Sequence, residues 1–369
     1  MIRCPSPIAD SVILARRVFV GLTVALLAVG CGGEMSTSDT TSVVEATTST
    51  SEVKPLTSMA AGEAIPGTSL RALVPGNDYL ADRINLVIAP WGWAVEVDFE
   101  RIALAMLSWD GDAYFITETG AIGADPTTAV GAQLGVFGIE PWRSSRDRFN
   151  VWITDVEPES PVSWVNQTEP PFSLPDQSVV VLALDAGRYN SDLTSVAGFD
   201  VHFVGPDPPQ RPAAGNPFAN VAIVLDSEFP SAGLLHVPHE LGHAMFNLPD
   251  EYVGQQLGYD DRGDLSSWPS CATDESQAHA WWGDLVGMVD PMVDTWGAEM
   301  DQAGFSMGDM TPIAQAVSVT DVDGGCYGVS GTIRATSDSL MNTNIPVLGS
   351  VNRRWAEQIL LLWQGTPRQ

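Results

Sequence analysis

The feature that most constrains the fold is the segment HVPHELGHAMFNLPDEY at residues 236–252. His239 and His243 stand four residues apart, so a helix would place both imidazole rings on one face, one turn apart. Two imidazoles at this spacing can bind a single Zn²⁺, and Glu240 between them would lie toward the open side of the metal. There it could act as the general base that takes a proton from zinc-bound water. The sequence therefore predicts a helix that carries two metal ligands and a catalytic carboxylate.

The motif leaves the third zinc ligand to be found. Residues 247–249, Asn-Leu-Pro, should end the helix, because proline cannot continue it. Asp250 lies seven residues beyond His243, and a chain that turns after the helix could bring its carboxylate under the zinc. Glu251 is the fallback third ligand. The alternative is that both acids are solvated, or that they orient the imidazoles by hydrogen bonds without touching the metal. We expect Asp250 to be the ligand.

The other histidines and a group of acidic residues receive no catalytic role. His236 precedes the motif by three residues, and Pro238 between them suits the first turn of a helix, so His236 is expected to be structural. His202 and His279 are isolated in the sequence. Several acids that follow the motif are candidates for Ca²⁺, but no EF-hand spacing occurs and solvated charge is the default interpretation; they include Asp260, Asp261, Asp264 and Asp301.

The N-terminus has the pattern of an export signal. Arg16 and Arg17 precede an apolar run of 13 residues, 18–30, which is too short for a transmembrane helix of about 20 residues. The run ends in Leu-Leu-Ala-Val-Gly-Cys-Gly, and small residues before Cys31 resemble a bacterial lipobox. Cys31 would then carry lipid and become the mature N-terminus, anchoring the protein to the bacterial cell envelope. The alternative is an ordinary signal peptide and a secreted protein.

The cysteines agree with export. Cys4 would leave with the signal and Cys31 would be lipidated, so Cys271 and Cys326 remain. An even number in an oxidising compartment predicts one disulfide between them. The alternative is two separate buried thiols.

Composition limits the kinds of partner. The formal net charge is −29, and Lys54 is the only lysine. A nucleic-acid-binding role is disfavoured because the phosphates would find no cationic surface, and a polybasic membrane patch is excluded for the same reason. We expect a protein or peptide substrate, membrane contact through the N-terminal lipid only, and a monomer.

The pattern along the chain predicts three parts. Residues 1–30 form the signal peptide, residues 31–66 the lipidated cysteine with a disordered Ser/Thr-rich tether, and residues 80–365 a globular domain. Apolar runs predict strands at 84–90, 179–184, 201–204 and 221–225, and alternation predicts one at 149–154. Helical spacing predicts helices at 95–107 and 351–363. Strands that alternate with helices indicate an α/β sheet covered by helices. Residues 253–325 are rich in Gly, Asp and Trp, with helical pieces near 277–286, and such a long irregular region is typically functional.

Several segments together resemble one family of enzymes. HELGHAMFNLPDEY is similar to the HExGH and DEY pattern of peptidase family M64, the IgA-peptidase family of zinc metallopeptidases. Four further segments resemble the same family in the same order: ADRINLVIAPWGW (81–93), GVFGIEPWRSSRDRFNVWITDVEPES (135–160), VAIVLDSE (221–228) and GGCYGVSGTIRATSDSLMN (324–342). The resemblance covers about residues 80–365. It implies an α/β, metzincin-like zinc peptidase domain with a mixed sheet, an active-site helix and a Met-turn-like segment.

The resemblance also implies roles for three residues outside the motif. Met341 would sit on a tight turn beneath the zinc and pack against the ligand imidazoles. Tyr252 and Tyr327 are candidate donors to the oxyanion of the reaction, although structural packing is the simpler role for each. The expected activity is zinc-dependent endopeptidase cleavage of extracytoplasmic proteins. The alternative is a catalytically inactive surface-binding lipoprotein that keeps the peptidase fold, and the presence of Glu240 favours the enzyme.

Overall fold

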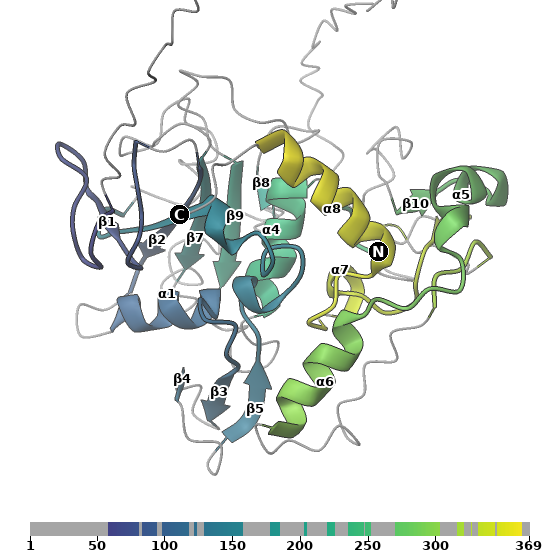
Figure 1. Cartoon of the computed structure of the whole chain (residues 1–369), viewed down its shortest axis with the longest axis horizontal. Helices are drawn as coiled ribbons and strands as arrows, with labels where there is room; N and C mark the ends of the chain where they lie inside the picture. Colours follow the sequence, from purple (N-terminus) through teal and green to yellow (C-terminus); the bar gives the residue numbers. More distant parts are fainter. Residues whose placement is uncertain are drawn as a thin grey trace, which may run out of the picture. The chain divides into compact units, whose positions relative to one another are not determined.

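The computed structural model describes most of the C-terminal part of the chain (Figure 1). The described residues are 58–80, 83–93, 98–117, 122–123, 129–157, 178–184, 203–204, 220–225, 235–246, 248–251, 270–302, 316–320, 326, 331–343 and 345–363. All of them belong to one compact unit, Pro55–Gln369. The export signal, Cys31 and residues 32–57 of the expected tether lie outside the described residues.

A six-stranded mixed sheet forms the centre of this unit (Figure 1). Its strand order is β1-β6-β2-β7-β9-β8, where the four inner strands are parallel and each edge strand is antiparallel to its neighbour. The strands are β1 (Leu70–Ala72), β2 (Ile84–Trp91), β6 (Phe149–Thr154), β7 (Ser178–Leu184), β8 (Phe203–Val204) and β9 (Asn220–Leu225). The predicted α/β class is therefore confirmed. The segments predicted to be strands at 84–90, 149–154, 179–184 and 221–225 are strands, and the one at 201–204 is a strand over its described residues, Phe203–Val204.

The inner strands are mostly apolar, with a few buried polar residues such as Asn85 and Asn150, because both faces of the sheet are covered. Every residue of β2 and β6 is buried, which matches the continuous apolar runs typical of parallel strands. Leu86 of β2 pairs with Val151 on one side and Val179 on the other.

The described structure includes residues 58–79, which precede residue 80, the expected start of the domain. Strand β1 pairs with β6, with Leu70 opposite Thr154. Met59 and Ile65, in the part of the sequence assigned to the tether, are buried, and Met59 forms a bridge with Asn77. Residues 58–66 therefore pack with the sheet. The sequence did not reveal this, because these residues follow a Ser/Thr-rich stretch and only two of their side chains, Met59 and Ile65, are buried.

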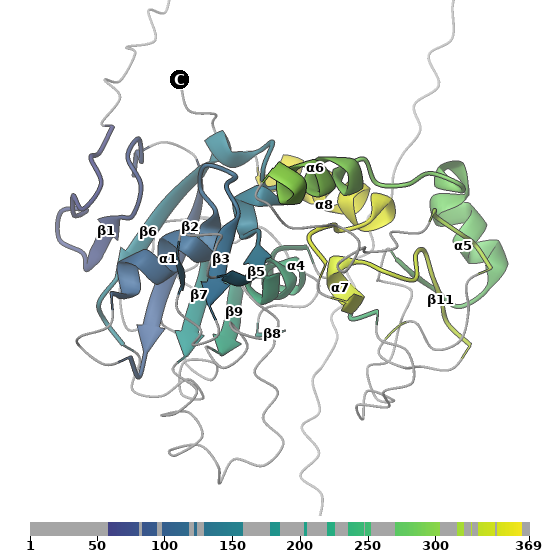
Figure 2. The same ribbon diagram turned by 90° about the horizontal axis from the view of Figure 1, so that it is seen from below.

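Six helices lie in the described part of the chain, and α4 packs directly on the sheet. They are α1 (Phe99–Leu107), α4 (His236–Phe246), α5 (Glu275–Trp282), α6 (Met292–Gln302), α7 (Leu340–Thr343) and α8 (Ser350–Trp363). Figures 1 and 2 both show α4 between the sheet and the pair α7 and α8, and α4 contacts all three. The indole N–H of Trp355 on α8 donates to the carbonyl of Phe246, 2.7 Å away, at the end of α4. None of the helices in the described part of the chain combines the length and the apolar character needed to cross a bilayer.

Short elements surround this core. Strands β3 (Tyr114–Thr117), β4 (Ile122–Gly123) and β5 (Ala129–Gln133) form an antiparallel sheet, and short 3₁₀ turns η2 (Val136–Gly138) and η3 (Arg146–Arg148) lead into β6. The helical piece expected near residues 277–286 is α5 followed by the turn η8 (Gly283–Leu285). Strands β10 (Cys271–Ala272) and β11 (Ile333–Arg334) pair antiparallel beside it.

Candidate metal centre

Helix α4 is buried on every side, and this sets the environment of the motif. All its residues from Val237 to Phe246 are buried. A helix enclosed in this way belongs to the core of a protein rather than to its surface. The polar side chains of His239, Glu240 and His243 are therefore held among apolar residues, where electrostatic interactions are stronger than in water.

Three side chains meet at one point beside this helix. The Nε2 atoms of His239 and His243 are 3.2 Å apart. Asp250 Oδ1 lies 3.1 Å from the first and 3.2 Å from the second. These three residues form the single group of His, Cys, Asp or Glu in the described part of the chain whose ligand atoms are close enough to share a metal ion. The structure thus brings Asp250 to the histidines, as the sequence analysis expected.

Two backbone carbonyls fix how the imidazoles present their nitrogens. His239 Nδ1 lies 2.8 Å from the carbonyl oxygen of Leu340, and His243 Nδ1 lies 2.5 Å from that of Leu248. A carbonyl oxygen only accepts, so each Nδ1 carries the hydrogen and donates it. Each Nε2 then faces the centre of the group. Metal-binding histidines characteristically donate their other ring N–H to a carbonyl or carboxylate in this way.

The group favours positive charge at its centre. Burial lowers the pKa of His239, but the hydrogen bond to Asp250 and the charges of Glu240 and Asp250 outweigh this and raise the pKa to about 9. Burial raises the pKa of Asp250, but His243 and the hydrogen bonds from both imidazoles hold it well below its usual range. Both shifts have the same cause, which is the mutual attraction of a carboxylate and a cation in a buried site.

The spacing and chemistry of the three atoms fit zinc. Zinc bonds of about 2.0–2.1 Å in a tetrahedron place neighbouring ligand atoms about 3.3–3.4 Å apart. The three separations of 3.1–3.2 Å are shorter than that value by only about 0.1–0.3 Å. Two nitrogens and one carboxylate oxygen also suit zinc better than Ca²⁺, which takes six or more oxygen ligands.

Glu240 lies beside the group without belonging to it. Its side chain is buried, and Oε1 is 3.9 Å from His239 Nε2. That distance is too long for a hydrogen bond but short enough to place the carboxylate next to the centre.

Met341 lies against helix α4 beside Gly242. A Cβ atom added to Gly242 would stand only 2.8 Å from Met341 Sδ, so the thioether packs directly against the backbone between the two histidines. The carbonyl of Leu340, the preceding residue, is the one that orients His239. Gly242 thus leaves room for Met341 beside the helix, a packing role that motif spacing alone did not single out.

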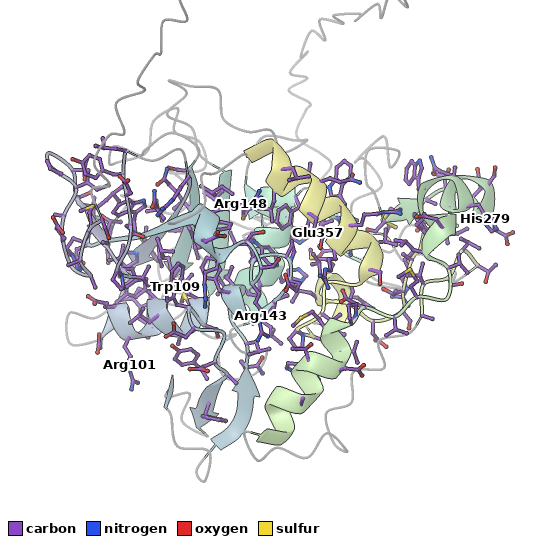
Figure 3. The ribbon with its side chains drawn as sticks, in the orientation of Figure 1. Arg101, Trp109, Arg143, Arg148, His279 and Glu357 are labelled. Atoms are coloured by element: carbon purple, nitrogen blue, oxygen red, sulfur yellow. A yellow bond between two sulfur atoms is a disulfide. The ribbon has the colours of Figure 1, made fainter. Side chains whose placement is uncertain are left out.

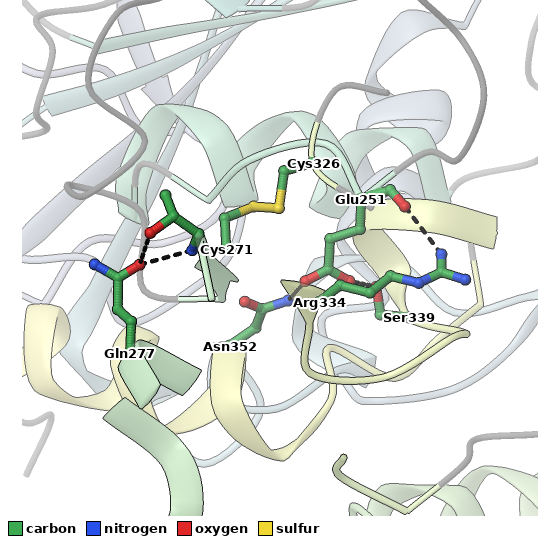
Figure 4. The surroundings of a disulfide bond; sticks show 8 residues. Glu251, Cys271, Gln277, Cys326, Arg334, Ser339 and Asn352 are labelled. Atoms are coloured by element: carbon green, nitrogen blue, oxygen red, sulfur yellow. Dashed lines mark hydrogen bonds between the residues drawn. A yellow bond between two sulfur atoms is a disulfide. The ribbon is translucent and has the colours of Figure 1, made fainter. Parts of the chain in front are cut away.

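Glu251 is not brought into the group. Its carboxylate accepts hydrogen bonds from Ser339 Oγ at 2.5 Å and Asn352 Nδ2 at 3.0 Å (Figure 4). The fallback interpretation of Glu251 as the third ligand is therefore not the arrangement in the structure.

Cys271 and Cys326 form a disulfide (Figure 4). Both cysteines are fully buried, and Cys271 begins β10, where it pairs with Arg334 of β11. The pairing expected from the number of cysteines is the one present. It joins the segment after the motif to the segment that leads into α7.

The remaining predicted residues do not join the site. The ring of His236 is stacked on that of His239, with centroids 6.2 Å apart, but it is not among the ligand atoms. His279 is exposed on α5 (Figure 3). Asp301 lies in α6, but the structure does not describe its side chain. The other predicted residues outside the described ranges are His202, Tyr252, Asp260, Asp261, Asp264 and Tyr327.

Two comparisons with known proteins found no relative of this chain. No protein-family model matches the chain, and a search of curated proteins gives no significant match.

Proposed function

We propose that this chain is a zinc-dependent endopeptidase that resembles the M64 family and binds one Zn²⁺ through His239, His243 and Asp250. The observation that carries the proposal is the convergence of the three ligand atoms at 3.1–3.2 Å, with both Nδ1 atoms turned away to backbone carbonyls. Zinc, when bound, supplies Lewis acidity that polarises a carbonyl and makes water acidic near neutral pH.

Glu240 is proposed to move the proton in peptide hydrolysis. Its buried carboxylate would take a proton from the attacking water and pass it to the nitrogen of the leaving amine, so that one C–N bond breaks and one C–O bond forms. Its place 3.9 Å from His239 Nε2 supports this role. A protein that only bound a ligand would have no use for a buried base at this position.

The finer fold and the location of the enzyme belong to the same proposal. We infer a metzincin-like domain in which Met341 forms the floor of the metal site, since its sulfur packs against Gly242 between the two ligands. We also infer export and attachment to the bacterial envelope through lipid on Cys31, with secretion as the alternative. The substrates would then be extracytoplasmic proteins or peptides, and the enzyme would act as a monomer.

The test is hydrolysis of denatured casein and of a peptide library, followed by mass spectrometry. The wild-type chain loaded with zinc should cleave internal peptide bonds, and a zinc chelator should abolish cleavage. Glu240→Gln should keep zinc and lower kcat by about 10²–10⁴-fold, because an amide cannot accept the proton. Glu275→Gln, the same chemical change at an exposed position on α5, is the matched control and should leave kcat unchanged.

Two outcomes would contradict the proposal in different ways. Cleavage by Glu240→Gln at the wild-type rate would remove Glu240 from the mechanism. A zinc-loaded wild-type chain that cleaves neither substrate would favour the surface-binding lipoprotein instead.

A further inference from the structure

Glu251 directly follows the proposed ligand Asp250, yet its carboxylate points elsewhere. The residue is buried, with 1% of its surface exposed. Removing a carboxylate from water is unfavourable by several kcal/mol unless other groups compensate. Burial accordingly raises the pKa of Glu251, and hydrogen bonds from Ser339 and Asn352 oppose that rise. Packing alone does not explain why an acidic side chain is buried at residue 251.

Four polar groups of Glu251 bind segments that lie far downstream in the sequence, and Figure 4 shows the contacts with Ser339, Asn352 and Arg334. Its carboxylate accepts from Ser339 Oγ, just before α7, and from Asn352 Nδ2 in the first turn of α8. Its backbone N–H donates to the carbonyl of Met341 at 2.9 Å. Its own carbonyl accepts from Arg334 Nη1 of β11 at 3.0 Å. The backbone and the side chain of Glu251, the residue after Asp250, are therefore both held by hydrogen bonds.

The segment Ser339–Met341 also holds the first histidine. The carbonyl of Leu340 accepts from His239 Nδ1, while Ser339 and Met341 on either side of it bind Glu251. Asp250 and His239, two of the three proposed ligands, are thus anchored to the same three residues. The contacts form a closed ring that runs from His239 through this segment and Glu251 to Asp250, and back to His239 Nε2.

We propose that Glu251 is a positioning residue of the metal centre, which holds Asp250 at its distance from the imidazoles by binding the segment that orients His239. The inference rests on the proposed metal site. Metal ligands must lie within about 0.2 Å of their ideal distances. Residues 248–251 have no regular secondary structure of their own, so the ring of hydrogen bonds replaces the rigidity that a helix or strand would give.

The test measures metal binding by the full chain after the metal has been removed. Zinc affinity is obtained by competition with a chromogenic chelator, and the visible spectrum of the Co²⁺ form reports the ligand geometry. Glu251→Ala removes both carboxylate contacts. Glu251→Gln is the conservative variant, because its amide oxygen can accept from Asn352 and its N–H can donate to the hydroxyl of Ser339.

Asp290→Ala is the matched control. Asp290 is also a buried acid, and its Oδ1 accepts from the backbone N–H of Met292 at 3.0 Å and from Arg353 Nη1 at 3.3 Å. It is not among the residues of the metal group. Its loss should lower the melting temperature of the metal-free protein without changing zinc affinity or the Co²⁺ spectrum.

Glu251→Ala should weaken zinc binding about 10–100-fold and alter the Co²⁺ bands, as loss of residues that orient metal ligands typically does. Glu251→Gln should restore most of the affinity. The proposal is wrong if Glu251→Ala binds zinc as tightly as wild type with the same Co²⁺ spectrum. If Glu251→Ala does not fold, Ser339→Ala removes one donor to the carboxylate and should weaken zinc about tenfold; unchanged affinity there refutes the proposal equally.

The wild-type measurement separates this inference from the function on which it rests. A wild-type chain that binds no zinc overturns the metal centre and this inference together. A wild-type chain that binds zinc, beside a Glu251→Ala variant that binds it equally well, overturns this inference alone.

Discussion

Replacing Gly242 by alanine sets two opposing effects against each other. Alanine is the better helix former by about 0.8–1.0 kcal/mol, so in an ordinary helix interior the change would stabilise the protein. Here the new Cβ would stand 2.8 Å from Met341 Sδ and 3.3 Å from its Cε. Contacts this short force the methionine to move, and overpacking of this kind costs about 1–3 kcal/mol. We expect a net destabilisation of about 0–2 kcal/mol.

A second substitution, Met341→Ala, should turn the effect of Gly242→Ala on stability from destabilising to stabilising. Met341→Ala removes the sulfur and the methyl group that the new Cβ would strike, at a cost of about 2–5 kcal/mol for the cavity. In that background Gly242→Ala should stabilise the protein by about 1 kcal/mol, because only the helix propensity remains. The coupling between the two positions is then the overpacking term, about 1–3 kcal/mol.

The assay is a double-mutant cycle on four proteins: wild type, each single variant and the double variant. The free energy of unfolding is measured by urea denaturation in the presence of a chelator, so that metal binding does not add to the stability of the folded state. If Gly242→Ala changes the free energy of unfolding equally in both backgrounds, Met341 does not pack against the helix between the two histidines.

Two further predictions concern the disulfide and the anchor. Replacing both Cys271 and Cys326 by alanine should lower the free energy of unfolding by about 4 kcal/mol, since the bridge closes a separation of 55 residues; a loss well under 1 kcal/mol, with the wild-type bridge verified by peptide mapping, would contradict this. Cys31→Ser should release the protein from the membrane fraction or leave its signal attached, because acyl chains hold a protein by about 0.8 kcal/mol per buried CH₂ group. Labelling with a clickable fatty acid checks this, and a wild-type protein that takes up no label and fractionates as soluble would be simply secreted.

The sequence predicted those parts of the molecule that depend on local spacing. The interval between His239 and His243 requires a helix for its chemistry, and α4 spans His236–Phe246. The alternating segment at 149–154 coincides with β6, Phe149–Thr154. The disulfide followed from the number of cysteines, because two remained once Cys4 and Cys31 were assigned to the proposed export signal and anchor.

The parts that escaped prediction depend on contacts between distant residues. Asp250 and Glu251 are adjacent acids with the same chemistry, and what distinguishes them is the position of Ser339 and Asn352, 88 and 101 residues away. The carbonyl of Leu340 orients His239, but every residue has a carbonyl and its side chain gives no sign of that role. The sequence favoured Asp250 and kept Glu251 as the fallback, but only the folded chain shows what holds Glu251 away from the imidazoles.

The pairing of β1 escaped prediction for the same reason. Leu70 lies opposite Thr154, and a three-residue strand is too short to show any periodicity. Which residues of such an edge strand pair depends on the neighbouring strand, here β6, and not on the sequence of the edge strand itself.

The most direct test of the metal centre is X-ray absorption at the zinc edge on the purified full chain. The account predicts about one zinc per chain, with two imidazole nitrogens and only nitrogen or oxygen ligands at about 2.0–2.1 Å. A sulfur ligand at about 2.3 Å, or a spectrum without imidazole scattering, would contradict the assignment of His239, His243 and Asp250 as the ligands.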